Sequence, residues 1–88
     1  MATLKRLKDG KTVSGRDVDA IKWQEDKTFG GVVGHKPIVG NSLLVSNSFN
    51  DYWLTTVVTE ILEEKKDEKE QLTYVKFKTQ NSIYELRY

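Results

Sequence analysis

Alternating apolar and polar positions in the second half of the chain predict β-strands. Residues 52–62 are rich in β-branched and aromatic side chains and contain no glycine or proline, which is typical of a strand. Alternate side chains of a strand point to opposite faces, so the neighbours Tyr52 and Trp53 are expected on opposite sides. The face of Trp53 would also carry Thr55, Val57, Thr59 and Ile61. A helix is the alternative beyond Thr59, because residues 59–69 are locally rich in Glu and Lys.

A β-hairpin is predicted over residues 72–88, with Gln80 and Asn81 as its two-residue turn. This register sets chemically matched side chains opposite each other, namely Phe77 and Tyr84, Lys76 and Glu85, Val75 and Leu86, and Tyr74 and Arg87. A shift by one residue would place Phe77 against Glu85 or Ile83 and would remove the acid from Lys76. The side of the hairpin predicted to be buried carries Val75, Phe77, Tyr84 and Leu86.

The first half of the chain is less regular. Asp9 and Gly10 form a strong turn signal between residues 4–8 and 11–13, which predicts a first short hairpin. Residues 18–24 fit either a further strand or one turn of helix begun by Ser14 or Asp17. Residues 25–40 hold four glycines and the only proline, so a long flexible connection is expected there, before a strand at 42–46. The charged residues 63–70 are expected to form a solvated connector.

These elements predict one all-β, or β-rich α+β, domain spanning residues 1–88. The expected architecture is a small antiparallel barrel or sandwich of about five to six strands with a carboxy-terminal hairpin. At 88 residues and 10.1 kDa the chain has room for one domain. A domain of this size buries only about 60% of the surface that its unfolded chain exposes. Association with further copies is therefore expected to help the fold.

Composition excludes several classes of function. The chain has no cysteine and a single histidine, His35, so disulfides, thiolate nucleophiles and the usual zinc sites are not expected. No apolar run approaches the about 20 residues that span a bilayer, and the first residues lack the pattern of a signal peptide. A cytoplasmic protein without membrane contact is expected. The 14 basic and 13 acidic residues give a net charge of +1, which argues against binding to long nucleic acid.

Charge is nevertheless unevenly distributed. Residues 4–16 carry five basic groups and one acid, whereas residues 60–70 carry six acids and three lysines. The first segment can form a local positive patch, and the second would repel an anion.

Catalytic chemistry has little support. The glycine-rich segment before Lys36 lacks the Walker spacing that holds phosphates. No serine lies in a recognisable nucleophile motif beside His35, which is expected to be a solvent-facing loop histidine. The acids cluster in one charged segment instead of lying on facing strands. The sequence therefore predicts a protein that is not an enzyme and needs no cofactor.

Aromatic and short polar side chains are the better candidates for binding. The chain has nine aromatic rings, and a ring that faces solvent or an interface can stack on a nucleobase. Hydroxyl and amide groups at strand ends can reach phosphate or base edges, although such groups serve ordinary turns equally well. Arg16 is a second possible phosphate partner beside the candidate ligand-binding set, which is Tyr52, Trp53, Thr55, Thr56, Asn81, Ser82, Tyr84 and Arg87.

Two segments, WLTTVVTEI at 53–61 and FKTQNSIY at 77–84, resemble a pattern of very short phage-encoded proteins. The chain resembles the phage anti-CBASS sponge family, the fourth anti-CBASS family, typified by a Bacillus phage protein. Thr56 stands where that pattern has Ser as often as Thr, and residues 1–39 add nothing to the resemblance. The resemblance implies a homotetramer that binds cyclic GMP-AMP and keeps it from the host defence effector, without cleaving it.

Two other readings remain open from the sequence. The chain could be a small β-barrel adaptor or inhibitor that binds a host protein through a strand edge or an aromatic patch. It could also bind single-stranded nucleic acid on a sheet face where aromatics alternate with Lys76 and Lys78. The near-neutral net charge disfavours the second reading.

Overall fold

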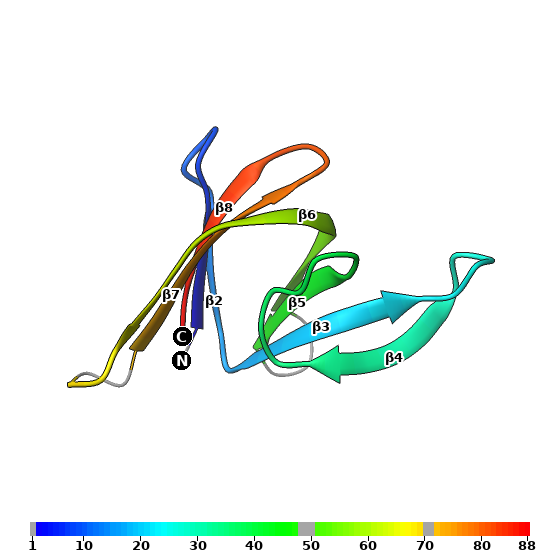
Figure 1. Cartoon of the computed structure of the whole chain (residues 1–88), viewed down its shortest axis with the longest axis horizontal. Coiled ribbons are helices and arrows are strands. Elements are labelled where there is room, and N and C mark those ends of the chain that lie inside the picture. The colour runs from blue at the N-terminus through cyan, green and yellow to red at the C-terminus, as the bar shows by residue number, and fades with distance from the viewer. Residues whose placement is uncertain (1, 48–50, 70–71) are drawn as a thin grey trace.

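The chain folds into β-strands joined by turns (Figure 1). The computed structural model describes residues 2–47, 51–69 and 72–88. Its strands are β1 (Ala2–Arg6), β2 (Thr12–Gly15), β3 (Asp17–Trp23), β4 (Phe29–Gly34), β5 (Ser42–Asn47), β6 (Asp51–Asp67), β7 (Leu72–Thr79) and β8 (Ile83–Arg87). The predicted all-β class and the carboxy-terminal hairpin are confirmed. The described ranges contain no helix that could cross a membrane.

All eight described strands belong to one antiparallel sheet with the order β2-β1-β8-β7-β6-β5-β3-β4. This number exceeds the predicted five to six strands. The sheet ends in two edges, β2 and β4, so it is not closed into a barrel. Edge β2 lies against β5, because the Arg16 amide donates to the Ser46 carbonyl oxygen at 2.8 Å. Gly15 permits this approach, since a Cβ atom there would lie 2.7 Å from that same oxygen.

The long strand β6 belongs to both halves of the sheet. Its first part pairs with β5, up to Val57 opposite Ser42, and its second part pairs with β7, from Val58 opposite Thr79. Figure 1 shows β6 arching from one half to the other. The pairing is irregular near Val58, and such bulges interrupt the alternation of faces. The predicted alternation therefore fails beyond Thr55, since Thr55 and Val58 are both buried.

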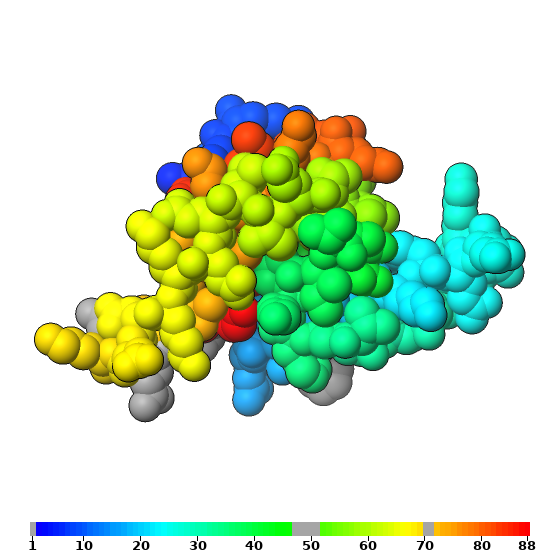
Figure 2. Space-filling model, in the orientation of Figure 1, coloured from blue at the N-terminus to red at the C-terminus, as the bar shows by residue number. Residues whose placement is uncertain are grey.

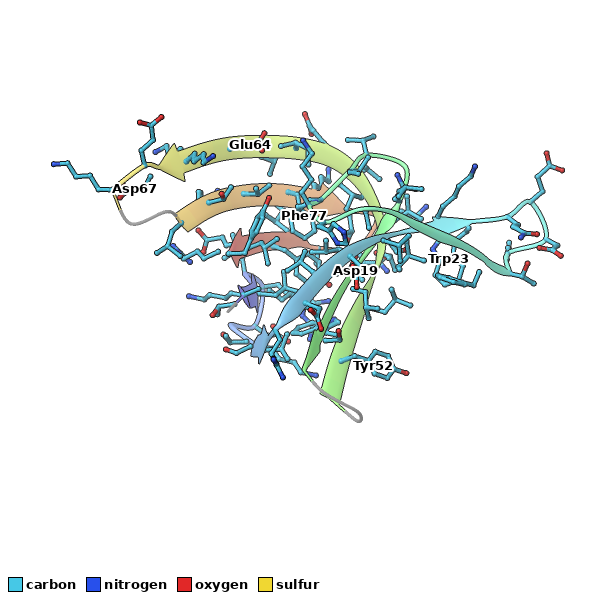
Figure 3. The ribbon with its side chains drawn as sticks, turned by 90° about the horizontal axis from the view of Figure 1, so that it is seen from below. Asp19, Trp23, Tyr52, Glu64, Asp67 and Phe77 are labelled. Atoms are coloured by element: carbon cyan, nitrogen blue, oxygen red, sulfur yellow. The ribbon has the colours of Figure 1, made fainter. Side chains whose placement is uncertain are left out.

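The core lies between the two halves that β6 connects. The rings of Phe77 and Tyr84 stack with centroids 5.3 Å apart, and the edge of Trp53 meets Tyr84 at 5.8 Å. Figure 3 shows Phe77 among the interior side chains. These rings pack in one cluster with buried aliphatic residues from both halves: Leu4, Val18, Leu43, Val45, Val58, Val75 and Leu86.

Both predicted hairpins form. Every predicted pair of the carboxy-terminal hairpin is observed, and its predicted buried side is buried. The amino-terminal hairpin joins β1 to β2, and Gly10 adopts the positive φ of 71° that its turn requires. For residues 18–24 the strand is the correct alternative, and it spans Asp17–Trp23.

Two predicted loops are strands in the structure. Residues 29–34, expected within a flexible connection, form β4 against β3. The charged residues 63–67, expected in a solvated connector, continue β6, and Glu63 pairs opposite Lys76. The same pairing rules out the helix beyond Thr59. In both places, hydrogen bonding to a neighbouring strand overrides a local composition that favours turns or helix.

Candidate functional site

Two hairpin turns meet at one end of the sheet and form a surface hollow of about 480 Å³. Strand β1 pairs with β8, and the Leu7 amide donates to the Ile83 carbonyl oxygen at 2.9 Å. This bond brings the β1–β2 loop beside the β7–β8 turn. We call this the turn-end hollow; its lining residues are Leu7, Lys8, Lys78, Gln80, Asn81, Ser82 and Ile83.

The buried Thr79 hydroxyl organises the β7–β8 turn. The Thr79 amide donates to the Ser82 carbonyl oxygen at 2.8 Å, which closes the turn. The Ser82 and Asn81 amides approach Thr79 Oγ1 at 3.3 and 3.4 Å. These bonds hold the backbone of the turn. Neither the side-chain amide of Asn81 nor the Ser82 hydroxyl bonds to another residue in the described ranges. These two side chains are available to a ligand.

The β1–β2 loop on the other side is fixed by Asp9. Its carboxylate accepts bonds of 3.1 and 2.6 Å from the Arg6 guanidinium and one of 3.1 Å from the Lys11 amide. The Arg6 guanidinium, and then the backbone bond, hold the pKa of Asp9 well below its ordinary value. Arg6 and Lys11 also lie over the Trp53 ring, 5.1 and 4.9 Å from its centroid.

The turn-end hollow favours an anion. In the part of the chain that the structure describes, two lysines, Lys8 and Lys78, line it and no acidic residue does. Among the described residues neither lysine forms an ion pair. Amines beside free amide and hydroxyl donors suit phosphate oxygens and the polar edges of bases. The apolar parts of Leu7 and Ile83 supply surface for a flat group.

A second surface has the opposite character. It is a groove of about 300 Å³ on the outer face of β3, β5 and the start of β6, and we call it the outer-face groove. Tyr52, which is 68% exposed, points away from the core at this face (Figure 3). The Trp23 indole donates to Ser42 Oγ at 2.8 Å, which fixes one wall. The described residues that line the groove carry no charge; they are Ile21, Trp23, Phe29, Leu44, Ser46, Tyr52 and Leu54.

A third hollow, of about 430 Å³, mixes charges of both signs near the carboxy-terminal Tyr88. His35, which is exposed, places Nδ1 2.9 Å from an Asp19 carboxylate oxygen. Arg16 and Asp17 also line this hollow, so its cations have carboxylates close by. Burial raises the pKa of the Tyr88 hydroxyl. Because charges of both signs line it, the third hollow is less suited to a doubly negative ligand than the turn-end hollow.

The structure brings only part of the predicted site together. Asn81 and Ser82 line the turn-end hollow, whereas Tyr52 lies in the outer-face groove. Arg87 is exposed and lies over the Tyr74 ring at 4.9 Å. Thr56 is exposed on β6, two residues before Val58, which pairs opposite Thr79.

The remaining predicted site residues serve the fold. Tyr84 is buried against Phe77, and Trp53 packs against the core on the face opposite Tyr52. The buried Thr55 hydroxyl accepts the Leu43 amide at 3.0 Å and donates to the Thr56 carbonyl oxygen at 2.7 Å. The single proton of that hydroxyl is therefore already donated within the fold, and one of its two acceptor positions is filled.

Sequence reasoning missed the contribution of Lys8 and the pairing of its loop with the β7–β8 turn. The excess of basic residues at 4–16 was a signal for it, but the position of that segment depends on the pairing of β1 with β8. Within the described ranges, no group of three His, Asp or Glu side chains could hold a metal ion. Comparison with protein-family models, curated proteins and solved structures finds no match to this chain.

Proposed function

We propose that this chain is a non-catalytic binding protein that captures a cyclic dinucleotide, such as cyclic GMP-AMP, in the turn-end hollow. In this proposal it acts as a phage-encoded sponge, which withholds the signal from a host defence effector and leaves the signal intact. Copies of the chain assemble, to a tetramer by the resemblance, so that a second copy can cover the open side of the hollow.

One observation carries the proposal. The two segments that resemble the sponge family, 53–61 and 77–84, are separate in sequence but lie on the neighbouring strands β6 and β7, where Val58 pairs opposite Thr79 and Ile61 opposite Phe77. The second segment continues into the turn that supplies Asn81 and Ser82 to the hollow. The second resembling segment therefore reaches the anion-favouring surface, and the later part of the first segment lies beside it in the sheet.

The chemistry of the hollow fits such a ligand. A cyclic dinucleotide carries two phosphodiester charges, which Lys8 and Lys78 can offset, and base edges that the Asn81 amide can read. The volume of the turn-end hollow, about 480 Å³, lies within the roughly 300–1,000 Å³ of small-molecule sites. The ligand is close to two-fold symmetric, so a site shared by two copies would supply each contact twice.

The lining side chains are suited to holding a ligand and poorly suited to cleaving it. Among the described residues that line the hollow, Ser82 carries the one hydroxyl, and none carries an imidazole or carboxylate that could take its proton. An ammonium group offsets charge without supplying a base at neutral pH. Capture without turnover is what this donor set supports.

Titration calorimetry with cyclic GMP-AMP tests the proposal, with chromatography of the ligand recovered after the protein is denatured. We expect tight binding and full recovery of intact ligand. Lys78→Gln should weaken binding about tenfold, because it removes a charged hydrogen bond, and the loss should shrink at high salt. Lys66→Gln, which makes the same change on an exposed part of β6, is the matched control. Absence of binding, or recovery of cleaved ligand, would contradict the proposal.

A further inference from the structure

Thr79 is the buried residue that leads into the turn of the turn-end hollow. It ends β7, is fully buried, and is not one of the residues that line the hollow. The three residues that follow it, 80–82, all line the hollow. In Figure 2 the β7–β8 turn (orange) lies beside the β1–β2 loop (blue) at the top of the molecule. A group that fixes the conformation of this turn therefore also fixes the shape of the hollow.

The Thr79 hydroxyl replaces a backbone acceptor in the turn. Two residues that form a hydrogen-bonded pair in an antiparallel hairpin exchange two backbone bonds. The Thr79 amide donates to the Ser82 carbonyl oxygen at 2.8 Å, but within the described ranges no backbone bond returns from the Ser82 amide to the Thr79 carbonyl oxygen. The Ser82 amide instead lies 3.3 Å from Thr79 Oγ1, and the Asn81 amide lies 3.4 Å from the same oxygen. One side-chain oxygen thus accepts both amides.

The backbone angles explain why the turn depends on this hydroxyl. Two-residue turns that match the twist of a hairpin have positive φ at one or both central residues. Lys27 is the one non-glycine residue of the described ranges with a positive φ, so Gln80 and Asn81 both have negative φ. Turns of that kind tend to splay the strands. The Thr79 hydroxyl opposes this, because it also donates to the Ser82 carbonyl oxygen at 3.3 Å.

We propose that Thr79 is a positioning residue for the ligand, because its hydroxyl holds Asn81 and Ser82 in the binding geometry before the ligand arrives. This inference rests on the function proposed above. The backbone amides of both residues are directed to Thr79 Oγ1, so the ligand meets their side chains. A ligand that meets an ordered turn does not have to order it, and its affinity is higher for that reason.

Titration calorimetry with cyclic GMP-AMP tests this role in Thr79→Val, which removes the hydroxyl and keeps the branched shape of the side chain. If the binding geometry is then populated in about a tenth of the molecules, the apparent Kd rises about tenfold. Thr79→Ser keeps the hydroxyl and should bind like the unmodified chain. The loss in Thr79→Val should be equal at low and high salt, because Lys8 and Lys78 are unchanged, whereas the loss in Lys78→Gln depends on salt.

Thr55→Val is the matched control. It removes another buried threonine hydroxyl that accepts a backbone amide, that of Leu43, at a residue that does not line the hollow. Each of the two valine substitutions should lower the thermal midpoint by about 5–10 °C, as the loss of a buried hydrogen bond does in a chain of this size. Only Thr79→Val should weaken binding. Equal weakening by Thr55→Val would overturn the proposal, because lost stability would then explain the lower affinity.

Backbone NMR relaxation of the isotope-labelled, unmodified chain tests the same role without a substitution. The amides of Asn81 and Ser82 should be as ordered without cyclic GMP-AMP as with it, because Thr79 already holds the turn. Amides that are mobile in the free chain and become ordered on binding would overturn the proposal, as would undiminished affinity of folded Thr79→Val. Absence of binding by the unmodified chain would contradict the proposed function and this inference together.

Discussion

The turn-end hollow and the outer-face groove show how one thin sheet can present two unlike surfaces. The hollow lies where strands end, and the turns there leave amine, amide and hydroxyl groups free. The groove lies on the face of β3 and β5, where the donors and acceptors of the backbone are used in pairing and aromatic rings remain. Turns therefore supply polar recognition, and a strand face supplies apolar contact.

The largest expected effect is at the neighbours Tyr52 and Trp53, of which the first lies in the outer-face groove and the second packs against the core. Trp53→Ala should lower the free energy of unfolding by about 2–3 kcal/mol, somewhat less than for a fully buried ring, because Trp53 packs on Tyr84 and beneath Arg6 and Lys11. Tyr52→Ala should change it by less than about 0.5 kcal/mol, as for other exposed sites. Urea unfolding measures both. Equal losses would show that the two rings are not divided between core and surface.

Thr55 and Thr56 give a second matched pair with a smaller effect. Thr55→Val leaves the Leu43 amide without its buried acceptor, so the free energy of unfolding should fall by about 1–2 kcal/mol. Thr56→Val, on the exposed side, should leave stability nearly unchanged. If Thr55→Val instead weakened ligand binding with full stability, the assignment of Thr55 to the fold would be wrong.

Asn81 should affect the ligand and leave the fold unchanged. Because its side-chain amide makes no hydrogen bond within the described parts of the chain, Asn81→Ala should leave thermal stability unchanged and weaken cyclic GMP-AMP binding about fivefold, the loss of roughly one hydrogen bond. The same substitution at Asn41, which does not line the hollow, is the control. Equal affinity for Asn81→Ala and the unmodified chain would remove Asn81 from the site.

The smallest expected effect is at alkaline pH. The hydrogen bond from the Tyr74 hydroxyl to Glu85 is the main cause that raises the pKa of Tyr74 to about 12. Because the folded value lies above the ordinary 10, this contribution to stability is complete below pH 10 and is lost as the pH rises toward 12. Tyrosinate absorbance should lose its latest-titrating tyrosine in Tyr74→Phe, whereas Tyr88, whose pKa burial also raises, should still titrate above the ordinary range. A Tyr74 that ionises in the ordinary range would contradict the bond.

The sequence predicts those parts of the fold in which local pattern and pairing agree. The register of the carboxy-terminal hairpin could be predicted because each pair, such as Lys76 with Glu85, is chemically matched and the turn is short. Strand β4 could not be predicted, since Gly30 and Gly31 are turn signals. Its strand conformation depends on its pairing with β3. The end of β6 was missed for the same reason, because its charged residues are held in a strand by β7.

The candidate site was predicted less well than the fold. Asn81 and Ser82 could be proposed together because both lie at the turn of the predicted hairpin, and both line the turn-end hollow. Lys8 could not be placed beside them, since that requires the pairing of β1 with β8. Tyr84 was expected at the ligand as a further ring able to stack on a base, but period-two geometry already placed it on the buried side of the hairpin, where it lies.

Amide chemical-shift mapping of the isotope-labelled chain with cyclic GMP-AMP tests the central claim most directly. We predict that the largest shifts fall on residues 79–83 and on Leu7 and Lys8, with small shifts on β3 and β5. Shifts centred on the outer-face groove, or no shifts at ligand concentrations that saturate other binding proteins, would contradict the turn-end hollow as the binding site.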